Sequence, residues 1–291
     1  MKVLVLGSKG QLGLSLRDHL SGTDHEVVYA SREQIDVTDL GEVEEKVTEV
    51  NPDFLINASA YTAVDEAERH WEEANAANNI AVSNLARVCL NLECWLIHVS
   101  TDYVFDGESQ LPYGEFDETA PRSVYGETKL EGERAIQSSG CSYIIIRTAW
   151  VFSEYGNNFL KSMMRLGRDH EELNVVADQT GCPTYAQDLA KAIIIMMPSL
   201  VTNPSYSGIY HYCGDEACTW HDFAVAIFSE AEKQGFQVPR KVNPISTAEY
   251  PTLAVRPRYS VLDCSAIFGS FGVSPSNWRL GIKQVIDDLN L

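Results

Sequence analysis

The chain has 291 residues, and its 22 Lys and Arg residues against 41 Asp and Glu residues give a formal net charge of −19. Nucleic acids and anionic membranes are bound through a surplus of basic side chains, so this charge argues against either as a partner. With 45% hydrophobic residues, the composition is that of an ordinary soluble globular protein, and the length allows about two domains of roughly 100–200 residues each.

Apolar runs and cysteines bear on the cellular location. The first apolar run, at residues 3–6, is too short for a signal peptide, and the longest later one, at residues 192–197, is far below the roughly 18 residues of a membrane span. The seven cysteines are scattered, without a Cys-x-x-Cys motif or zinc-ligand spacing. Reduced thiols are typical of the cytosol, so we expect a soluble, cytoplasmic protein.

The first half of the chain alternates short apolar runs with helical patterns. Runs rich in Val, Ile and aromatic residues predict buried strands at residues 3–6, 26–30, 54–57, 95–99 and 143–147. A periodicity of 3.6 residues predicts helices at residues 11–20, 40–50, 71–90 and 125–138. This alternation implies right-handed crossovers and a parallel sheet covered on both faces. We therefore expect an α/β fold, with a doubly wound, Rossmann-like parallel sheet in residues 1–150.

Beyond residue 150, Pro and Gly become more frequent. A strand at residues 209–213 and helices at 187–197 and 220–233 are expected to rejoin the first domain, so that about 184–235 belongs to it. The remainder, 151–183 and 236–291, is predicted to form a smaller, mixed, substrate-binding lobe. Ligands of such folds usually bind in the cleft beyond the carboxyl ends of the strands.

A glycine-rich loop follows the first predicted strand and opens the first helix. Gly7 permits a tight turn, Gly10 lets the backbone approach a phosphate, and Gly13 lets the helix pack closely on the strand. Gln11 and Leu12 begin the helix, whose N-terminal N–H groups would face the anion. The spacing is G-x-x-G-x-x-G rather than G-x-G-x-x-G, and the strand–helix context indicates a dinucleotide site rather than a plain glycine turn.

The end of the second predicted strand indicates which dinucleotide binds. An NAD site has Asp or Glu there, to accept from the ribose 2′-hydroxyl. This chain has Ser31 and Arg32 instead, a pair that suits a 2′-phosphate because arginine can grip it through two donors. We expect NADP (NADPH) as the cofactor, with NAD as the weaker alternative.

The strongest chemical signal is the pair Tyr125 and Lys129. On a helix, residues i and i+4 share one face, so the ammonium of Lys129 would lower the pKa of the Tyr125 phenol. The phenol could then donate a proton to a carbonyl oxygen. Thr101, at the end of the fourth predicted strand, could polarise the same oxygen. A surface Tyr–Lys pair alone would usually be structural, but together with the phosphate loop it favours a catalytic site.

This set of features resembles the extended short-chain dehydrogenase/reductase family, and within it the reductases of dTDP-linked 4-keto-6-deoxy sugars. Each motif alone is weak, but the ordered set spans the chain and is highly specific. The motifs are Asn-Ala-Ser-Ala-Tyr-Thr-Ala-Val-Asp at 57–65, Ser-Thr-Asp-Tyr-Val-Phe at 100–105, Arg-Thr-Ala-Trp-Val-Phe at 147–152, Gly-Asn-Asn-Phe at 156–159, Asp-Gln-Thr-Gly-Cys-Pro-Thr at 178–184 and Arg-Pro at 256–257.

The resemblance implies a role for each matching residue. Tyr125 would be the proton donor, Lys129 would bind the nicotinamide ribose and Thr101 would polarise the keto oxygen. Further residues would line the cofactor: Ala58, Ala60, Tyr61 and Thr62 along its length, with Asp36 and Val37 beside the adenine. Others would bind the substrate: Asp102, Trp150 against the sugar, and Asn158 and Arg256 at the nucleotide diphosphate, unless Arg256 pairs with a carboxylate of the protein.

The activity implied by the resemblance is NADPH-dependent reduction of dTDP-4-dehydro-6-deoxy-L-mannose at C4, giving dTDP-L-rhamnose for polysaccharide synthesis. Two alternatives stay open. One is a reductase of another 4-keto-6-deoxy sugar, or with the opposite stereochemistry at C4. The other is a non-catalytic NADP-binding module similar to the regulatory subunit of methionine adenosyltransferase, although the retained Tyr125, Lys129 and Thr101 favour an enzyme.

One feature of the family is altered in this chain. Some members hold a magnesium ion between two subunits through glutamates, and the matching positions here are Ser15, Gln187 and Asp288. Neither Ser nor Gln supplies the carboxylate that a hard cation favours. We therefore expect no metal and a monomer or homodimer without a metal bridge.

Overall fold

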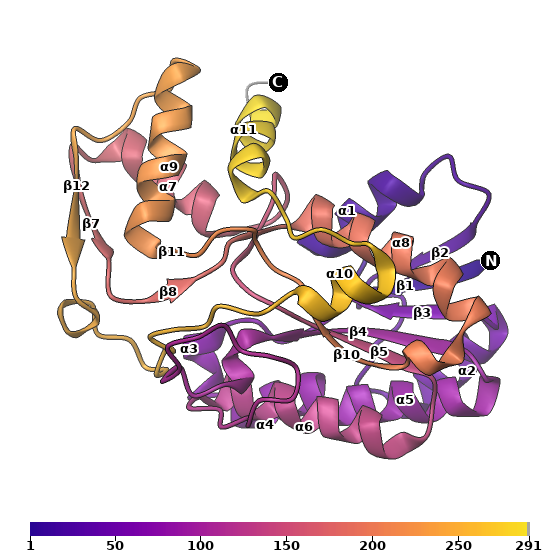
Figure 1. Cartoon of the computed structure of the whole chain (residues 1–291). Coiled ribbons are helices and arrows are strands. Elements are labelled where there is room, and N and C mark those ends of the chain that lie inside the picture. The colour runs from indigo at the N-terminus through magenta and orange to yellow at the C-terminus, as the bar shows by residue number, and fades with distance from the viewer. Residues whose placement is uncertain (290–291) are drawn as a thin grey trace.

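A six-stranded, fully parallel sheet forms the centre of the computed structural model, which describes residues 1–289 (Figure 1). The strands run in the order β10-β5-β4-β3-β1-β2. Their bounds are β1 (Lys2–Leu6), β2 (Glu26–Ala30), β3 (Phe54–Asn57), β4 (Trp95–Thr101), β5 (Tyr143–Thr148) and β10 (Gly208–His211). The order reverses between β1 and β3, which confirms the doubly wound topology and places a crevice at the carboxyl ends of these strands.

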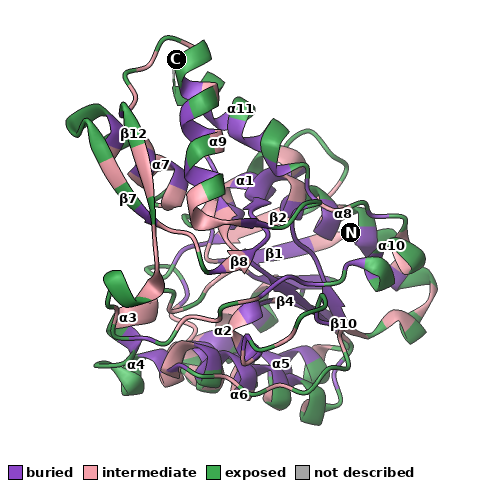
Figure 2. Cartoon of the chain, turned by 60° about the vertical axis from the view of Figure 1, so that its left-hand side comes forward, coloured by how far each residue is buried: buried purple, intermediate pink, exposed green. Residues whose placement is uncertain are grey.

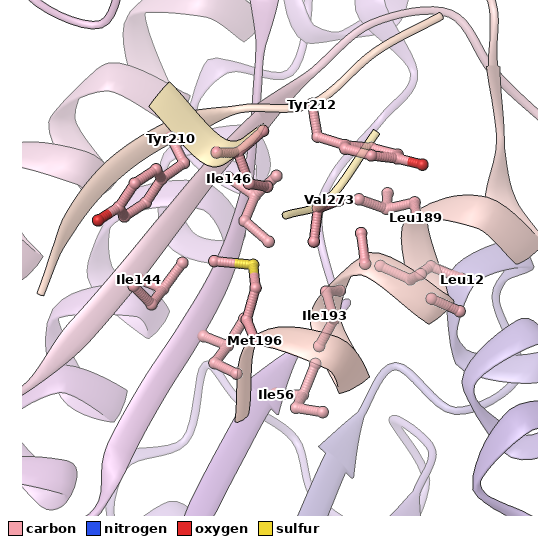
Figure 3. Close-up of a cluster of buried hydrophobic side chains, with 14 of the residues drawn as sticks. Leu12, Ile56, Ile144, Ile146, Leu189, Ile193, Met196, Tyr210, Tyr212 and Val273 are labelled. Atoms are coloured by element: carbon pink, nitrogen blue, oxygen red, sulfur yellow. The ribbon is translucent and has the colours of Figure 1, made fainter. Parts of the chain in front are cut away.

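Helices cover both faces of the sheet, and the alternation of side chains along β1 shows why. Val3 and Val5 point into one core with α1 (Gln11–Leu20) and α8 (Ala186–Thr202), whereas Leu4 and Leu6 point into another. That second core lies against α2 (Leu40–Val50), α5 (Ala81–Leu92) and α6 (Val124–Ser139). Figure 3 shows the first core, with Leu12 of α1 and Ile193 and Met196 of α8 packed against Ile56 and Ile144 of the sheet.

A third hydrophobic core lies apart from the sheet, around Phe223 and Trp278. Its elements are α7 (Phe159–Asp169), α9 (Trp220–Lys233), α11 (Trp278–Leu289) and the parallel ribbon of β7 (Glu172–Val176) and β12 (Lys241–Ile245). The ribbon is largely half-buried or exposed, in contrast to the inner strands β1, β3 and β4 of the central sheet (Figure 2). α8 and β10 lie on the sheet, but α9, which we expected to rejoin it, packs into this third core instead.

Most strands and helices expected in the first half are present within a few residues of their expected bounds. The exception is the helix expected at 71–90. It is divided into α4 (Trp71–Asn75), a π-helical turn η1 (Ala76–Ile80) and α5. The side chain of Asn78 in this turn bonds both the N–H and the carbonyl of Tyr61, at 2.9 and 3.1 Å. The wider turn thereby holds the loop after β3.

Several shorter elements complete the described chain. They are the helices α3 (Val64–Ala67) and α10 (Ser265–Phe271), the strand pairs β6 (Val151–Phe152) with β9 (Thr184–Tyr185) and β8 (Thr180–Gly181) with β11 (Cys218–Thr219), and the 3₁₀ turns η2 (Asp102–Val104), η3 (Pro204–Tyr206) and η4 (Thr247–Glu249). Among residues 1–289, none of the helices is long and apolar enough to cross a membrane. All seven cysteines are buried free thiols.

Candidate active site

A cavity of about 560 Å³ opens at the carboxyl ends of the central strands. The sheet side of its wall comes from the loop after β1, the loop after β3, and the ends of β4 and β5. The opposite wall includes Trp150, Asn158, Trp220 and Arg256. The cavity therefore lies at the edge predicted for a doubly wound sheet, and it brings together residues from widely separated parts of the chain.

The glycine-rich loop has the backbone that an anion site requires. Gly7 has a φ of +75°, and a Cβ there would lie 2.7 Å from the backbone of Ala58. A Cβ on Gly13 would lie 2.4 Å from the Gly7 carbonyl oxygen, so only glycine allows α1 to start this close to β1. Gly10 caps α1 without a side-chain hydrogen bond, and the first turn carries no acidic residue. Because Gly10, Gln11 and Leu12 line the cavity, the free N–H groups of α1 fit a pyrophosphate.

A second cavity, of about 340 Å³, adjoins the same loop. Its lining includes Gly7, Arg32, Asp36, Val37, Ala60 and Tyr61, all of which the sequence predicted for cofactor binding. The guanidinium of Arg32 is 82% exposed and lies 3.7 Å from the Asp36 carboxylate. It is therefore free to turn towards a phosphate, with only a weak surface ion pair to lose.

Ser31 is placed differently from its expected role. It is buried, it does not line either cavity, and its hydroxyl donates to the Glu33 carboxylate at 2.5 Å. Lys9 bonds the same carboxylate at 3.0 Å. Hydrogen bonds from Ser31 and Lys9 lower the pKa of Glu33 to about 2. Ser31 thus holds the turn after β2, and of the predicted pair only Arg32 is available to a ligand.

Tyr125 and Thr101 meet inside the main cavity. The Thr101 hydroxyl donates to the Asp102 carboxylate at 3.0 Å and lies within hydrogen-bond reach of Tyr125. Burial raises the pKa of Asp102 to about 6, although hydrogen bonds from Ser260 and Thr101 oppose the shift. The ring of Tyr103 packs edge-on against Tyr125, with centroids 5.5 Å apart. Hydroxyl, phenol and carboxyl therefore converge on one point of the cavity wall.

Lys129 lies one turn after Tyr125 in α6 and is almost fully buried. Its amine donates to the Val99 carbonyl at 2.6 Å and lies 3.2 Å from His98 Nε2. Burial lowers its pKa to about 8, while the nearby Glu133 raises it. Lys129 is nevertheless among the residues that line the cavity.

The expected lowering of the Tyr125 pKa is not found. Burial raises the pKa of Tyr125 well above its usual value, and the charges of Asp102 and Tyr103 add to the rise. Lys129 is not among the groups that shift it, because its amine is directed towards Val99 and His98. A raised pKa keeps the phenol protonated at neutral pH, which is the form that a general acid needs.

The predicted substrate residues occupy the far wall. Trp150, with a φ of +48°, stacks on Trp220 at a centroid distance of 3.5 Å. The Asn158 amide caps α7 and donates to Gln11 at 2.9 Å, tying this wall to the start of α1. Arg256 bonds the Asp65 carboxylate at 2.6 Å and the Tyr103 hydroxyl at 3.1 Å. The carboxylate pairing considered for Arg256 is thus present, and the arginine still faces the cavity.

The remaining predicted residues are accounted for as follows. Ala58 and Thr62 line the main cavity, whereas Gly13 supports the loop from behind. Of the three positions that match the family's metal site, Asp288 keeps its carboxylate and two are changed: the Ser15 hydroxyl donates to the Gln11 carbonyl, and the Gln187 amide donates to Asp18 at 2.8 Å and to Glu154. Among residues 1–289, no group of three or more His, Cys, Asp or Glu side chains could hold a metal ion.

Several residues of the site were not predicted, and three of them stand out. His98 contacts Lys129, Trp220 stacks on Trp150, and Asn78 fixes the Tyr61 loop. His98 precedes Ser100 of the Ser-Thr-Asp motif by two positions in the same strand. Residues two apart in a strand point to the same face, so the sequence could have indicated that His98 lies near the site. Trp220 begins a helix far along the chain, where neither periodicity nor spacing points to the cavity.

Comparison with known proteins agrees with this geometry. The family model of the RmlD substrate binding domain matches residues 1–291. The dTDP-4-dehydrorhamnose reductase of Aggregatibacter actinomycetemcomitans is 42% identical over 288 residues, covering 98% of each chain. Crystal structures of dTDP-4-dehydrorhamnose reductases from Clostridium acetobutylicum (39% identical, TM-score 0.92, all of both chains) and Bacillus anthracis in complex with NADP (34%, 0.90, 99% of both chains) have the same fold.

Proposed function

Since this chain belongs to the RmlD substrate binding domain family, we propose that it reduces the C4 keto group of dTDP-4-dehydro-6-deoxy-L-mannose with NADPH, giving dTDP-L-rhamnose. The observation that carries the proposal is the convergence of Tyr125 and Thr101 in a cavity that also holds the N-terminus of α1. A phosphate-binding helix end and a proton donor in one cavity are what hydride transfer from a dinucleotide to a ketone requires.

The cofactor supplies the hydride when it is bound. The chain's own residues hold it and prepare the ketone: the N–H groups of α1 and Arg32 bind its phosphates, and Lys129 binds its ribose. The Thr101 hydroxyl turns from the Asp102 carboxylate to donate to the keto oxygen, and Tyr125 gives up its proton to that oxygen as the alkoxide forms. Trp150 and Trp220, stacked face to face, both line the cavity and offer apolar surface on which the deoxysugar can pack.

The substrate lobe is also part of the proposal. Residues 151–183 and 236–291 supply Asn158 and Arg256 to the cavity, and α9 contributes Trp220. We assign the nucleotide diphosphate to the side of Arg256 and Asn158, both of which line the cavity. Cytoplasmic location fits the seven free thiols, and a monomer or a homodimer without a bridging metal fits Ser15 and Gln187.

The test is to incubate the protein with dTDP-4-dehydro-6-deoxy-L-mannose and NADPH and to determine the C4 configuration of the product by NMR. We expect stoichiometric NADPH oxidation and dTDP-L-rhamnose. The epimeric product, or turnover only with another 4-keto sugar, would support the first alternative. NADP binding without turnover of any nucleotide-linked keto sugar would support the binding-module alternative.

A further inference from the structure

Tyr103 is a residue of the cavity wall that has no role in the function proposed above. It lies in the turn η2 directly after β4, and both Tyr103 and Arg256 line the main cavity. The Tyr103 hydroxyl oxygen accepts from Nη1 of Arg256 at 3.1 Å. Within residues 1–289, Arg256 is the one hydrogen-bond partner of this hydroxyl. The hydroxyl is therefore used as an acceptor, and its capacity to donate calls for an explanation.

The hydrogen of the Tyr103 hydroxyl has no acceptor among the groups around it. A guanidinium carries donors only, so Arg256 cannot take the hydrogen. The adjacent Asp102 carboxylate is bonded instead by Thr101 and Ser260. Burial raises the pKa of Tyr103 to about 12, so the hydrogen stays on the phenol at neutral pH. The phenol can therefore donate to a ligand in the cavity.

Arg256 adds positive charge at the same place. Its Nη2 bonds the Asp65 carboxylate at 2.6 Å while its Nη1 bonds Tyr103, so two bonds fix the orientation of the guanidinium. The side chain is still 26% exposed, and Asp65 is not among the residues that line the cavity. Because the guanidinium donates to the phenol oxygen, it polarises the O–H bond and makes the phenol a stronger donor. A cation beside a polarised donor favours an anionic oxygen over a neutral one.

We propose that Tyr103 is a further substrate-binding residue, whose O–H donates to an oxygen of the nucleotide diphosphate beside Arg256. The inference rests on the proposed function, which places the keto oxygen of the sugar at Tyr125 and Thr101. The diphosphate is attached to the sugar across the ring from C4. The ring of Tyr103 meets the ring of Tyr125 edge-on, with centroids 5.5 Å apart. One side chain is thus placed to support the proton donor with its ring and to bind the diphosphate with its hydroxyl.

Tyr103 is held in place before any ligand binds. Its backbone N–H donates to the Thr101 hydroxyl oxygen at 3.2 Å. Its carbonyl oxygen lies against Gly126, where a Cβ would come within 2.2 Å of it, and its ring packs on Tyr125. A donor whose backbone and ring are already fixed loses little freedom on binding, so less of the energy of its hydrogen bond is offset by ordering.

The experiment is calorimetric titration of the full-length wild type and Tyr103→Phe with dTDP, thymidine and NADP⁺. The substitution removes the hydroxyl and keeps the ring against Tyr125. We expect dTDP affinity to fall by about 10- to 100-fold, the value of a hydrogen bond to a charged group. Thymidine has no phosphate and NADP⁺ does not use this residue, so both affinities should change less than about threefold. Tyr250→Phe, at a tyrosine that is 58% exposed and outside the cavity lining, is the matched control and should change none of the three.

Tyr103→Phe also deprives Arg256 of an acceptor, and a second background separates the two effects. In Arg256→Gln the phenol can still donate to a phosphate, so adding Tyr103→Phe should lower dTDP affinity by at least about a further threefold. A hydroxyl that acted only by orienting the guanidinium would have no effect there. In steady-state kinetics with the keto sugar, Tyr103→Phe alone should raise KM by about 10- to 100-fold and leave kcat within about threefold, because the ring contact with Tyr125 is kept.

Three results would overturn the inference and leave the proposed reductase function standing: equal dTDP affinity in wild type and Tyr103→Phe, an equal loss of thymidine affinity, or no effect of Tyr103→Phe in the Arg256→Gln background. Unchanged NADP⁺ affinity shows in each case that the variant is folded. A wild-type protein that binds no dTDP would contradict the proposed function itself, and the inference with it.

Discussion

Asp102 is a residue of the site whose burial lowers the stability of the fold. Its carboxyl is fully buried in the cavity wall, and its pKa is raised to about 6 from an ordinary value of 3.8. Because the fold favours the protonated form, the penalty for burying the charge is absent below pH 3.8. It grows between pH 3.8 and 6, and it is complete above pH 6.

The substitution Asp102→Asn removes that charge and keeps an oxygen that can accept from Thr101. We expect it to stabilise the fold at pH 7 by on the order of 2 kcal/mol, with the gain shrinking as the pH falls towards 4. Urea unfolding of both proteins at several pH values measures the difference. A gain that stays constant with pH, or a loss at pH 7, would show that the carboxyl is ionised without penalty.

Arg32 is the residue that should set the choice between cofactors. Its side chain is exposed at the second cavity and pairs weakly with Asp36. Arg32→Gln should weaken NADPH binding by about 10- to 100-fold, the value of a charge-assisted hydrogen bond, and should change NADH binding less than about threefold. Calorimetric titration with each cofactor gives the two values. Equal losses for both would place the 2′-phosphate elsewhere.

At the scale of elements, the close contact of α6 with the turn after β4 positions Tyr125. A Cβ on Gly126 would lie 2.2 Å from the Tyr103 carbonyl oxygen, so Gly126→Ala must push the two apart. We expect a loss of about 1–3 kcal/mol in unfolding free energy, together with a fall in turnover as Tyr125 moves away from Thr101. Urea unfolding and steady-state kinetics measure the two effects.

A matched control is Gly269→Ala, also inside a helix. A Cβ there meets no atom within 4 Å, so this variant should be neutral or more stable by about 0.4–1 kcal/mol, with unchanged turnover. Equal behaviour of the two variants would mean that the contact between α6 and Tyr103 does not position the phenol.

The elements also show what the sequence could predict. Strands such as β3 and helices such as α1 were predictable because their apolar patterns are local. The division of the helix after residue 71 could not be predicted. In its π turn, Asn78 bonds Tyr61, a residue 17 positions earlier, and helical periodicity does not show such a contact. The ribbon of β7 and β12 escaped prediction for a similar reason, since its two half-exposed strands pair across 69 residues.

The same contrast holds for the site. Glycines and a Tyr–Lys pair have spacings that a sequence displays, so the cavity lining could be expected. The direction in which the Lys129 side chain points could not be expected, because it is set by contacts of its amine with His98 and the Val99 carbonyl, which belong to another element. The expected lowering of the Tyr125 pKa was wrong because burial of the phenol, which spacing does not reveal, raises it, and Lys129 is not among the groups that shift it.

At the scale of the whole molecule, the charge of −19 opposes ligands that are themselves polyanions. The cations near the site do little to offset it, since Lys9 pairs with Glu33 and Arg256 with Asp65. We therefore expect the association rate of NADPH, measured by stopped-flow fluorescence, to rise as NaCl increases from about 10 to about 150 mM, where screening shortens the field. The uncharged ligand thymidine should show no such trend. A rate for NADPH that falls with salt would mean that local cations steer it.

The central claim is that Tyr125 protonates the keto oxygen of a nucleotide-linked sugar, and turnover by Tyr125→Phe tests it most directly. The ring is retained and only the hydroxyl is lost, so NADPH affinity should change less than about threefold. With dTDP-4-dehydro-6-deoxy-L-mannose as substrate, we predict that kcat/KM for NADPH oxidation falls by about 10²- to 10⁴-fold, the usual contribution of a general acid. A folded Tyr125→Phe protein with kcat/KM within about threefold of wild type would contradict the account.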